Sequence, residues 1–240
     1  MSASAEDAAG AKPAAARPRD AATLILIERK GGKTRVLMGK RHAGHAFMPG
    51  KFVFPGGAVE AADRRMSVAG PLDPIVEAKL LAETRHSSPG FARALALAAL
   101  RETFEETGLA LGVADRGAPR NPPQGAWTRF AATGVTPALD GLDFLARAIT
   151  PPGRARRFDA RFFVADSSLV AHRTPGVVHA GAELVELVWT PLDQALELDS
   201  PAITRRVLAD LALAARAGMD RFRQRPFYRI LRGKAWRGEL

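Results

Sequence analysis

Residues 101–109 carry the side chains best suited to chemistry, in the order Arg-Glu-Thr-Phe-Glu-Glu-Thr-Gly-Leu. On a helix, which turns by about 100° per residue, Glu102, Glu105 and Glu106 project on the same side. Three carboxylates on one helix face supply the oxygen ligands that Mg²⁺ or Mn²⁺ prefers, whereas without a cation they repel one another. The alternative is an ordinary solvent-facing helix, rich in Glu because Glu favours helices.

A helix over residues 92–107 would position these carboxylates. Leu97, Leu100 and Phe104 project on the side opposite the glutamates, so the helix is expected to pack one way and present its carboxylates the other way. Gly108 follows the last helical residue, as glycine commonly does just past a helix C-terminus. The sequence therefore predicts an acidic helix face near the point where this helix ends.

The remaining elements alternate between strands and helices. Runs typical of strands occupy residues 23–27, 34–38, 52–54, 142–149, 158–165 and 183–189, and further helices are predicted near 127–132 and 201–217. Gly31 and Gly32 lie between the first two runs and indicate a hairpin. This order predicts a layered α/β or α+β domain.

The chain divides into three predicted parts. Residues 1–20 are rich in Ala and Pro without an apolar period, which predicts a flexible extension. Residues 21–217 are expected to form one domain with an insertion over about 64–90, and residues 218–240 a basic C-terminal tail. Residues 201–240 hold ten basic and three acidic side chains, a balance that attracts anions of any kind.

The composition excludes several classes of protein. With 47% apolar and 25% charged residues the chain is globular rather than disordered or fibrous. It has no cysteine, so disulfides, thiolate metal sites and a cysteine nucleophile are excluded, and a metal bound by oxygen is expected. No apolar run approaches the length of a membrane span, and the N-terminus lacks the pattern of a targeting peptide, which favours the cytoplasm.

Together with Phe54-Pro55-Gly56-Gly57 upstream, residues 101–109 resemble the Nudix box, written in that family as G-x5-E-x7-R-E-U-x-E-E-x-G-U with U aliphatic. The second half matches except at Thr103, which stands at an aliphatic position. In the first half Gly57 fits, and Asp63 stands where the family has Glu. Between Asp63 and Arg101 lie 37 residues where the pattern has seven. A surface loop can accept such an insertion, because the entropic cost of closing a loop grows only slowly with its length.

The resemblance covers about residues 23–189 and implies the Nudix fold, an α/β/α sandwich around a mixed sheet. It implies hydrolysis of a nucleoside diphosphate linked to another moiety, with Mg²⁺ or Mn²⁺ neutralising the diphosphate and activating a water. Arg101 is then the residue that orients the glutamates. The implied metal ligands are the carbonyl of Gly56 and the carboxylates of Glu102, Glu105 and Glu106. The general base stays open among Glu102, Glu183 and Glu186.

A second, partial resemblance concerns the substrate. Upstream of the box, Nudix coenzyme A diphosphatases carry L-L-T-x-R-[SA]-x3-R-x3-G-x3-F-P-G-G, to which Arg41 and Gly50 correspond. Ala46 replaces the second arginine of that motif. Arg157 belongs to a basic segment similar to one in the subgroup with the insertion, some of whose members act on CoA esters. Arg41 and Arg157 are therefore expected to bind substrate, with CoA or acyl-CoA ahead of ADP-ribose, NADH or a nucleotide sugar.

For partners, we expect a small nucleotide-derived substrate and no membrane. The oligomeric state stays open, with a homodimer as the common arrangement among such proteins. A second hypothesis is a non-catalytic Nudix-fold module whose basic tail binds nucleic acid, motivated by the tail charge and by the interrupted box.

Overall fold

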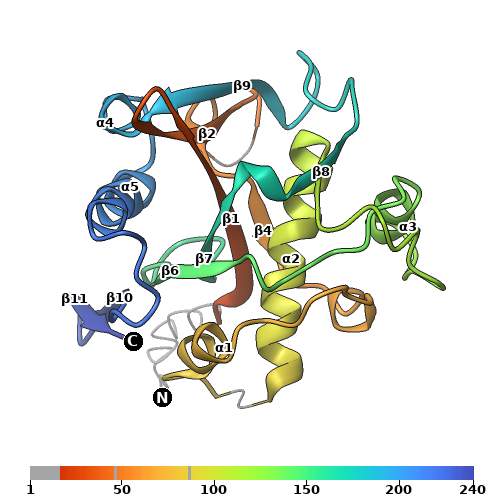
Figure 1. The fold of residues 1–240 in the computed structure, drawn as a ribbon. Coiled ribbons are helices and arrows are strands. Elements are labelled where there is room, and N and C mark those ends of the chain that lie inside the picture. Colours follow the sequence, from red (N-terminus) through yellow and green to blue (C-terminus); the bar gives the residue numbers. More distant parts are fainter. Residues whose placement is uncertain (1–16, 46–47, 86–87) are drawn as a thin grey trace, which may run out of the picture.

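The computed structural model describes residues 17–45, 48–85 and 88–240 (Figure 1). Most of the expected N-terminal extension, residues 1–16, lies outside the described part. Its last two residues, Arg19 and Asp20, already belong to the first strand. In the described part, no helix is long and apolar enough to cross a membrane.

Nine strands of the described part form one mixed sheet with the order β11-β10-β6-β7-β1-β2-β3, to which β4 adds next to β1 and β9 next to β2. The predicted hairpin is confirmed, because Ile27 pairs with Val36 and the turn residues Gly31 and Gly32 have φ of 59° and 74°. A separate pair joins β5 to β8. The strands are β1 (Arg19–Lys30), β2 (Lys33–Arg41), β3 (Phe52–Val53), β4 (Gly56–Ala58), β5 (Leu109–Leu111), β6 (Asp143–Ile149), β7 (Phe158–Asp166), β8 (Val170–Arg173), β9 (Leu184–Pro191), β10 (Pro226–Leu231) and β11 (Lys234–Glu239).

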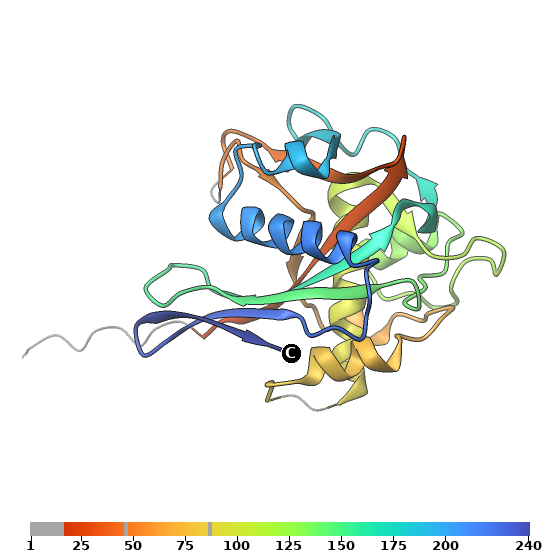
Figure 2. The same ribbon diagram turned by 60° about the vertical axis from the view of Figure 1, so that its left-hand side comes forward.

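Helices cover both faces of the sheet (Figures 1 and 2). Leu24 and Leu26 of β1 pack toward α2, whereas Ile25 packs with Val207 and Leu211 of α5. This alternation follows from the two-residue period of a strand and produces one hydrophobic core on each side. The helices are α1 (Pro74–Leu81), α2 (Pro89–Thr107), α3 (Ala126–Ala131), α4 (Leu192–Ala195) and α5 (Ala202–Arg216), with short 3₁₀ turns η1 (Asp63–Arg65) and η2 (Ser167–Leu169). The expected α/β/α sandwich is thereby confirmed.

The segment predicted as a basic tail forms two strands instead. Strand β10 pairs in parallel with β6, and β11 pairs with β10, so both extend the main sheet. Arg225, just before β10, is buried and donates from Nε to the carbonyl of Phe144. Residues 226–231 are mostly apolar and compatible with a strand, but the positive charge of the surrounding segment favoured a tail, and the strand β6 with which they pair lies far upstream.

The insertion packs against the C-terminal segment. Lys79 of α1 donates to the carbonyl of Arg221 over 2.7 Å, and Arg221 itself forms an ion pair with Asp73. Arg229 of β10 contacts Glu83 just after α1, with 2.9 Å between Nη2 and Oε2. The insertion therefore supports the edge of the sheet at which the C-terminal hairpin is added.

Candidate active site

Helix α2 is buried on nearly all sides rather than on one. On the side predicted to be acidic, Leu95, Arg101 and Glu106 are buried, because β1, β4 and η1 all pack around the helix. Thr103, which departs from the aliphatic position of the box, is fully buried and donates its hydroxyl to the carbonyl of Ala99 over 2.8 Å. That bond satisfies its polar group, so threonine is tolerated there.

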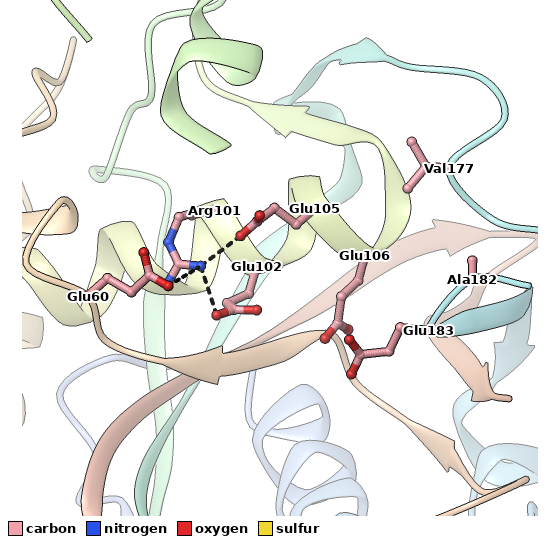
Figure 3. Close-up of a pocket in the computed structure, with 8 residues that line it drawn as sticks. All are labelled: Glu60, Arg101, Glu102, Glu105, Glu106, Val177, Ala182 and Glu183. Atoms are coloured by element: carbon pink, nitrogen blue, oxygen red, sulfur yellow. Dashed lines mark hydrogen bonds and ion pairs between the residues drawn. The ribbon is translucent and has the colours of Figure 1, made fainter. Parts of the chain in front are cut away.

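Arg101 lies at the centre of the polar network on α2 (Figure 3). Its Nε and Nη2 donate to the two carboxylate oxygens of Asp63 at 2.8 and 3.2 Å. Its Nη1 donates to Glu102 at 2.8 Å and to Glu105 at 2.7 Å. One guanidinium group therefore contacts two glutamates of the box, and its orienting role in catalysis stays a prediction.

Asp63 anchors this arginine from the far side of the insertion. It is completely buried, and it also accepts hydrogen bonds from Trp127 Nε1 at 2.9 Å and from the backbone N–H of Glu60 at 2.8 Å. Four N–H donors thus hold a single buried carboxylate. Trp127 comes from α3, and no signal in the sequence connected it to the box.

The carboxylates face a pocket of about 300 Å³ (Figure 3). Glu183, which directly precedes β9, enters the pocket opposite Glu106, and their carboxylates point toward each other. Arg129 of α3 contacts Glu105 at the rim, with 3.1 Å between Nη2 and Oε1. The residues lining the pocket are Glu60, Arg101, Glu102, Glu105, Glu106, Val177, Ala182 and Glu183.

Arg41 is a buried neighbour of the pocket. It lies at the end of β2, beside an irregularity in the pairing with β9, and its Nη1 donates to Glu183 over 2.7 Å. His45 also lies against this pair, with Nε2 3.5 Å from the same carboxylate oxygen. Arg41 thus binds a carboxylate of the pocket itself, whereas the sequence predicted that it binds substrate.

Burial and crowding favour the protonated forms of two glutamates. Burial raises the pKa of Glu102 to about 6, although the Arg101 guanidinium opposes that shift. Burial and the Glu183 carboxylate raise the pKa of Glu106 well above its ordinary value, against the opposing influence of Arg41. Oε2 of Glu106 is buried and has no hydrogen-bond partner in the described part of the chain. A cation in the pocket would stabilise both carboxylates in their charged form.

The two glycines of the box let the chain approach closely. A Cβ on Gly57 would lie 2.4 Å from Oε1 of Glu102, and a Cβ on Gly56 would lie 2.6 Å from the carbonyl oxygen of Ala22. Both glycines belong to β4, which pairs with β1. Only hydrogen fits where β4 passes between β1 and Glu102.

The structure brings most of the predicted site residues together, but not all of them. Gly56 lies beside the carboxylate of Glu106, and Glu183 lines the pocket. Glu186, the other candidate base, is exposed on β9 and is not among the lining residues. Arg157 precedes β7 and donates from Nε to the carbonyl of Thr150, outside the pocket.

The expected three-carboxylate cluster is not preformed. Among the described residues, no three His, Asp or Glu side chains converge closely enough to hold a metal ion. The reason is local, because Nη1 of Arg101 contacts both Glu102 and Glu105, while Glu106 turns toward Glu183.

Comparison with known proteins adds independent information. A crystal structure of a Nudix hydrolase from Alicyclobacillus acidocaldarius is similar, with a TM-score of 0.61 and 30% identity over 80% of this chain and 90% of that one. The curated acyl-coenzyme A diphosphatase NUDT19 of Gallus gallus is 26% identical over 75% of this chain. The chain spans 62% of the length of that relative. No protein-family model matches the chain.

A mixed sheet between helical layers, with a box helix that presents glutamates to a pocket, defines a hydrolase fold of the Nudix type. The similarity to the Alicyclobacillus enzyme agrees with this assignment over most of both chains. The chain therefore belongs to the Nudix hydrolase superfamily, whose enzymes hydrolyse diphosphate bonds.

Proposed function

We propose that this enzyme cleaves the diphosphate bond of CoA or acyl-CoA with the help of Mg²⁺ or Mn²⁺. The observation that carries the cation requirement is the carboxylate-rich pocket, in which Glu106 has a buried oxygen without a partner. The acyl-coenzyme A diphosphatase relative and the insertion within the box support the choice of substrate. The products would be 3′,5′-ADP and a phosphopantetheine.

The donor set fits a hard divalent cation. Carboxylate oxygens are the ligands that such cations prefer, and the pocket holds several of them beside the buried Arg101 and Arg41. Glu102, Glu105, Glu106 and the carbonyl of Gly56 would hold the cation, with Glu183 close to Glu106. When bound, the cation would neutralise charge on the diphosphate and make a water more acidic.

The side chains of the pocket have two further roles, positioning the carboxylates and accepting a proton from the attacking water. Arg101 restricts Glu102 and Glu105, and Arg41 holds Glu183 toward Glu106. Glu102, with its pKa near 6, is suited to accept a proton from the attacking water near neutral pH. Glu183 is the alternative base, because it also lines the pocket.

The test of the substrate is hydrolysis of a panel of CoA, an acyl-CoA, ADP-ribose, NADH and a nucleotide sugar. Each reaction is run with Mg²⁺, with Mn²⁺ and with EDTA, and the products are identified by mass. We expect cation-dependent release of 3′,5′-ADP from CoA or acyl-CoA. Turnover of ADP-ribose, NADH or the nucleotide sugar alone would contradict the CoA assignment, and turnover in EDTA would contradict the metal assignment.

Two variants test the ligands, Glu105→Gln and Glu106→Gln. Each removes charge from the pocket without removing volume, so turnover should fall by roughly 100-fold while the fold is retained. Glu186→Gln is the matched control, because Glu186 is exposed outside the pocket and should leave turnover unchanged. Rates like those of the wild type in both pocket variants would refute the ligand assignment.

The nucleic-acid hypothesis loses part of its basis in the structure. Arg221 and Arg229 form ion pairs with Asp73 and Glu83, and Arg225 is buried. Deleting residues 218–240 would remove two strands of the sheet, so that truncation would test the fold rather than a tail.

A further inference from the structure

A second hollow adjoins the carboxylate pocket and shares Glu60 with it. Its volume is about 380 Å³, and it lies where the start of β1 meets the loop after β4 and the start of α2. Its charged lining residues are Arg19, Asp20, Glu60 and Arg64, and Val59 and Phe91 contribute apolar wall.

Two of these charged side chains, Arg19 and Arg64, are exposed to solvent. Within the described part of the chain, no ion pair is found for the exposed side chains of Arg19 and Arg64. Asp20 is bound by Arg161, with 2.7 Å between Oδ1 and Nη1. Glu60 points toward Arg101, 4.0 Å away across the boundary with the first pocket. The two carboxylates of the hollow thus face other arginines, whereas the guanidinium groups of Arg19 and Arg64 are left to meet an anion.

A buried arginine, Arg161, lies against the Phe91 wall of the hollow, and ion pairs with Asp20 and Asp159 balance its charge. The guanidinium groups of Arg64 and Arg161 lie 5.9 and 5.5 Å from the centre of the Phe91 ring. Arg161 is fully buried, and its Nε and Nη2 have no hydrogen-bond partner in the described residues. N–H donors without acceptors in a low-dielectric wall favour an anion nearby, even where ion pairs balance the net charge.

Fixed backbone presents both exposed arginines. The N–H of Arg19 donates to the carbonyl of Arg157 over 2.9 Å, within the pairing of β1 and β7. Arg64 directly follows the buried Asp63, and its carbonyl accepts from Nη1 of Arg93 at 3.0 Å. Because the backbone is already fixed at both positions, ligand binding would order only the side chains.

We propose that this second hollow binds a phosphate monoester carried by the nucleotide half of the substrate, outside the bond that is cleaved. The inference rests on the proposed function, because it places the diphosphate of the substrate among the glutamates of the first pocket. A molecule placed there reaches the second hollow past Glu60, and guanidinium groups match the geometry of phosphate oxygens. In CoA this group is the phosphate on the ribose 3′ oxygen.

The test compares CoA with dephospho-CoA, which lacks that phosphate, in the wild type and in the double variant Arg19→Gln/Arg64→Gln. For CoA, KM should rise about tenfold or more in the double variant with kcat unchanged, and for dephospho-CoA both constants should stay the same. The matched control is Arg29→Gln/Arg216→Gln, which removes two exposed arginines that line neither hollow. Equal effects of the double variant on both substrates, or no effect on either, would overturn the proposal.

A binding measurement separates this inference from the proposed function. Calorimetric titration with 3′,5′-ADP and with 5′-AMP requires no turnover. We expect the wild type to bind 3′,5′-ADP about tenfold more tightly than 5′-AMP, and the double variant to lose that preference. If the wild type fails to cleave CoA but shows this preference, the function fails and the phosphate site stands. If CoA is cleaved and the preference is absent or survives in the double variant, the site fails and the function stands.

Discussion

The substitution Asp63→Asn tests how the interrupted box is held together. Asp63 is completely buried and receives two hydrogen bonds from Arg101, one from Trp127 and one from the backbone of Glu60. Asparagine has nearly the same shape, but it removes the charge and replaces one accepting oxygen with an NH₂ group that faces other donors. Arg101 would then remain buried without its two-point partner.

The expected decrease in the free energy of unfolding follows from the loss of the ion pair between Asp63 and Arg101. Breaking a buried ion pair by removing one partner costs about 3–5 kcal/mol. For a chain of 240 residues this corresponds to a decrease in Tm of roughly 6–20 °C, at about 2–4 °C per kcal/mol. Turnover should fall as well, because the same guanidinium positions Glu102 and Glu105.

Urea denaturation and thermal unfolding provide the assay, with turnover measured on the same preparations. Asp115→Asn is the matched control, since it makes the same chemical change at an exposed residue and should alter the free energy of unfolding by less than about 0.5 kcal/mol. If Asp63→Asn unfolds within about 1 kcal/mol of the wild type and keeps its turnover, the reasoning about the anchor is wrong.

Three further predictions concern the glycine contact, the cation and the insertion. Gly57→Ala should lower turnover by about tenfold or more, because its Cβ would displace the Glu102 carboxylate, whereas Gly90→Ala, with open space around it, should not. Enzyme kinetics on the two alanine variants check this, and equal rates would count against the contact. The pKa of Glu102 is raised to about 6, so its charged form is lost as pH falls through 6. Mn²⁺ affinity measured by calorimetry should therefore weaken from pH 7 to pH 5, and an affinity independent of pH would contradict a role for Glu102 as ligand. Lys79→Met should destabilise the protein by about 1–3 kcal/mol, because it leaves the carbonyl of a C-terminal loop without its charged donor. Urea denaturation measures the loss, and an unchanged midpoint would show that the contact between insertion and C-terminal segment adds nothing.

The sequence by itself determined the parts of the protein that depend on local chemistry. The helical period of residues 101–107 placed three glutamates on one side, and Gly108, with φ of 76°, ends the helix as predicted. The hairpin at Gly31 and Gly32 was likewise predictable, because two glycines between β-forming runs determine both strands and turn. These features require information only from neighbours within a few residues.

Tertiary structure alone decided how the glutamates are used. The partner of Arg101 is 38 positions upstream, and the carboxylate opposite Glu106 comes from residue 183, just before β9. Helical periodicity assigns a side chain to a face but does not say what packs there, so it could not show that Arg101 occupies the space between Glu102 and Glu105. The place of strands β10 and β11 in the sheet was also undetermined locally, since it depends on the pairing of β10 with β6, which lies far upstream in the sequence.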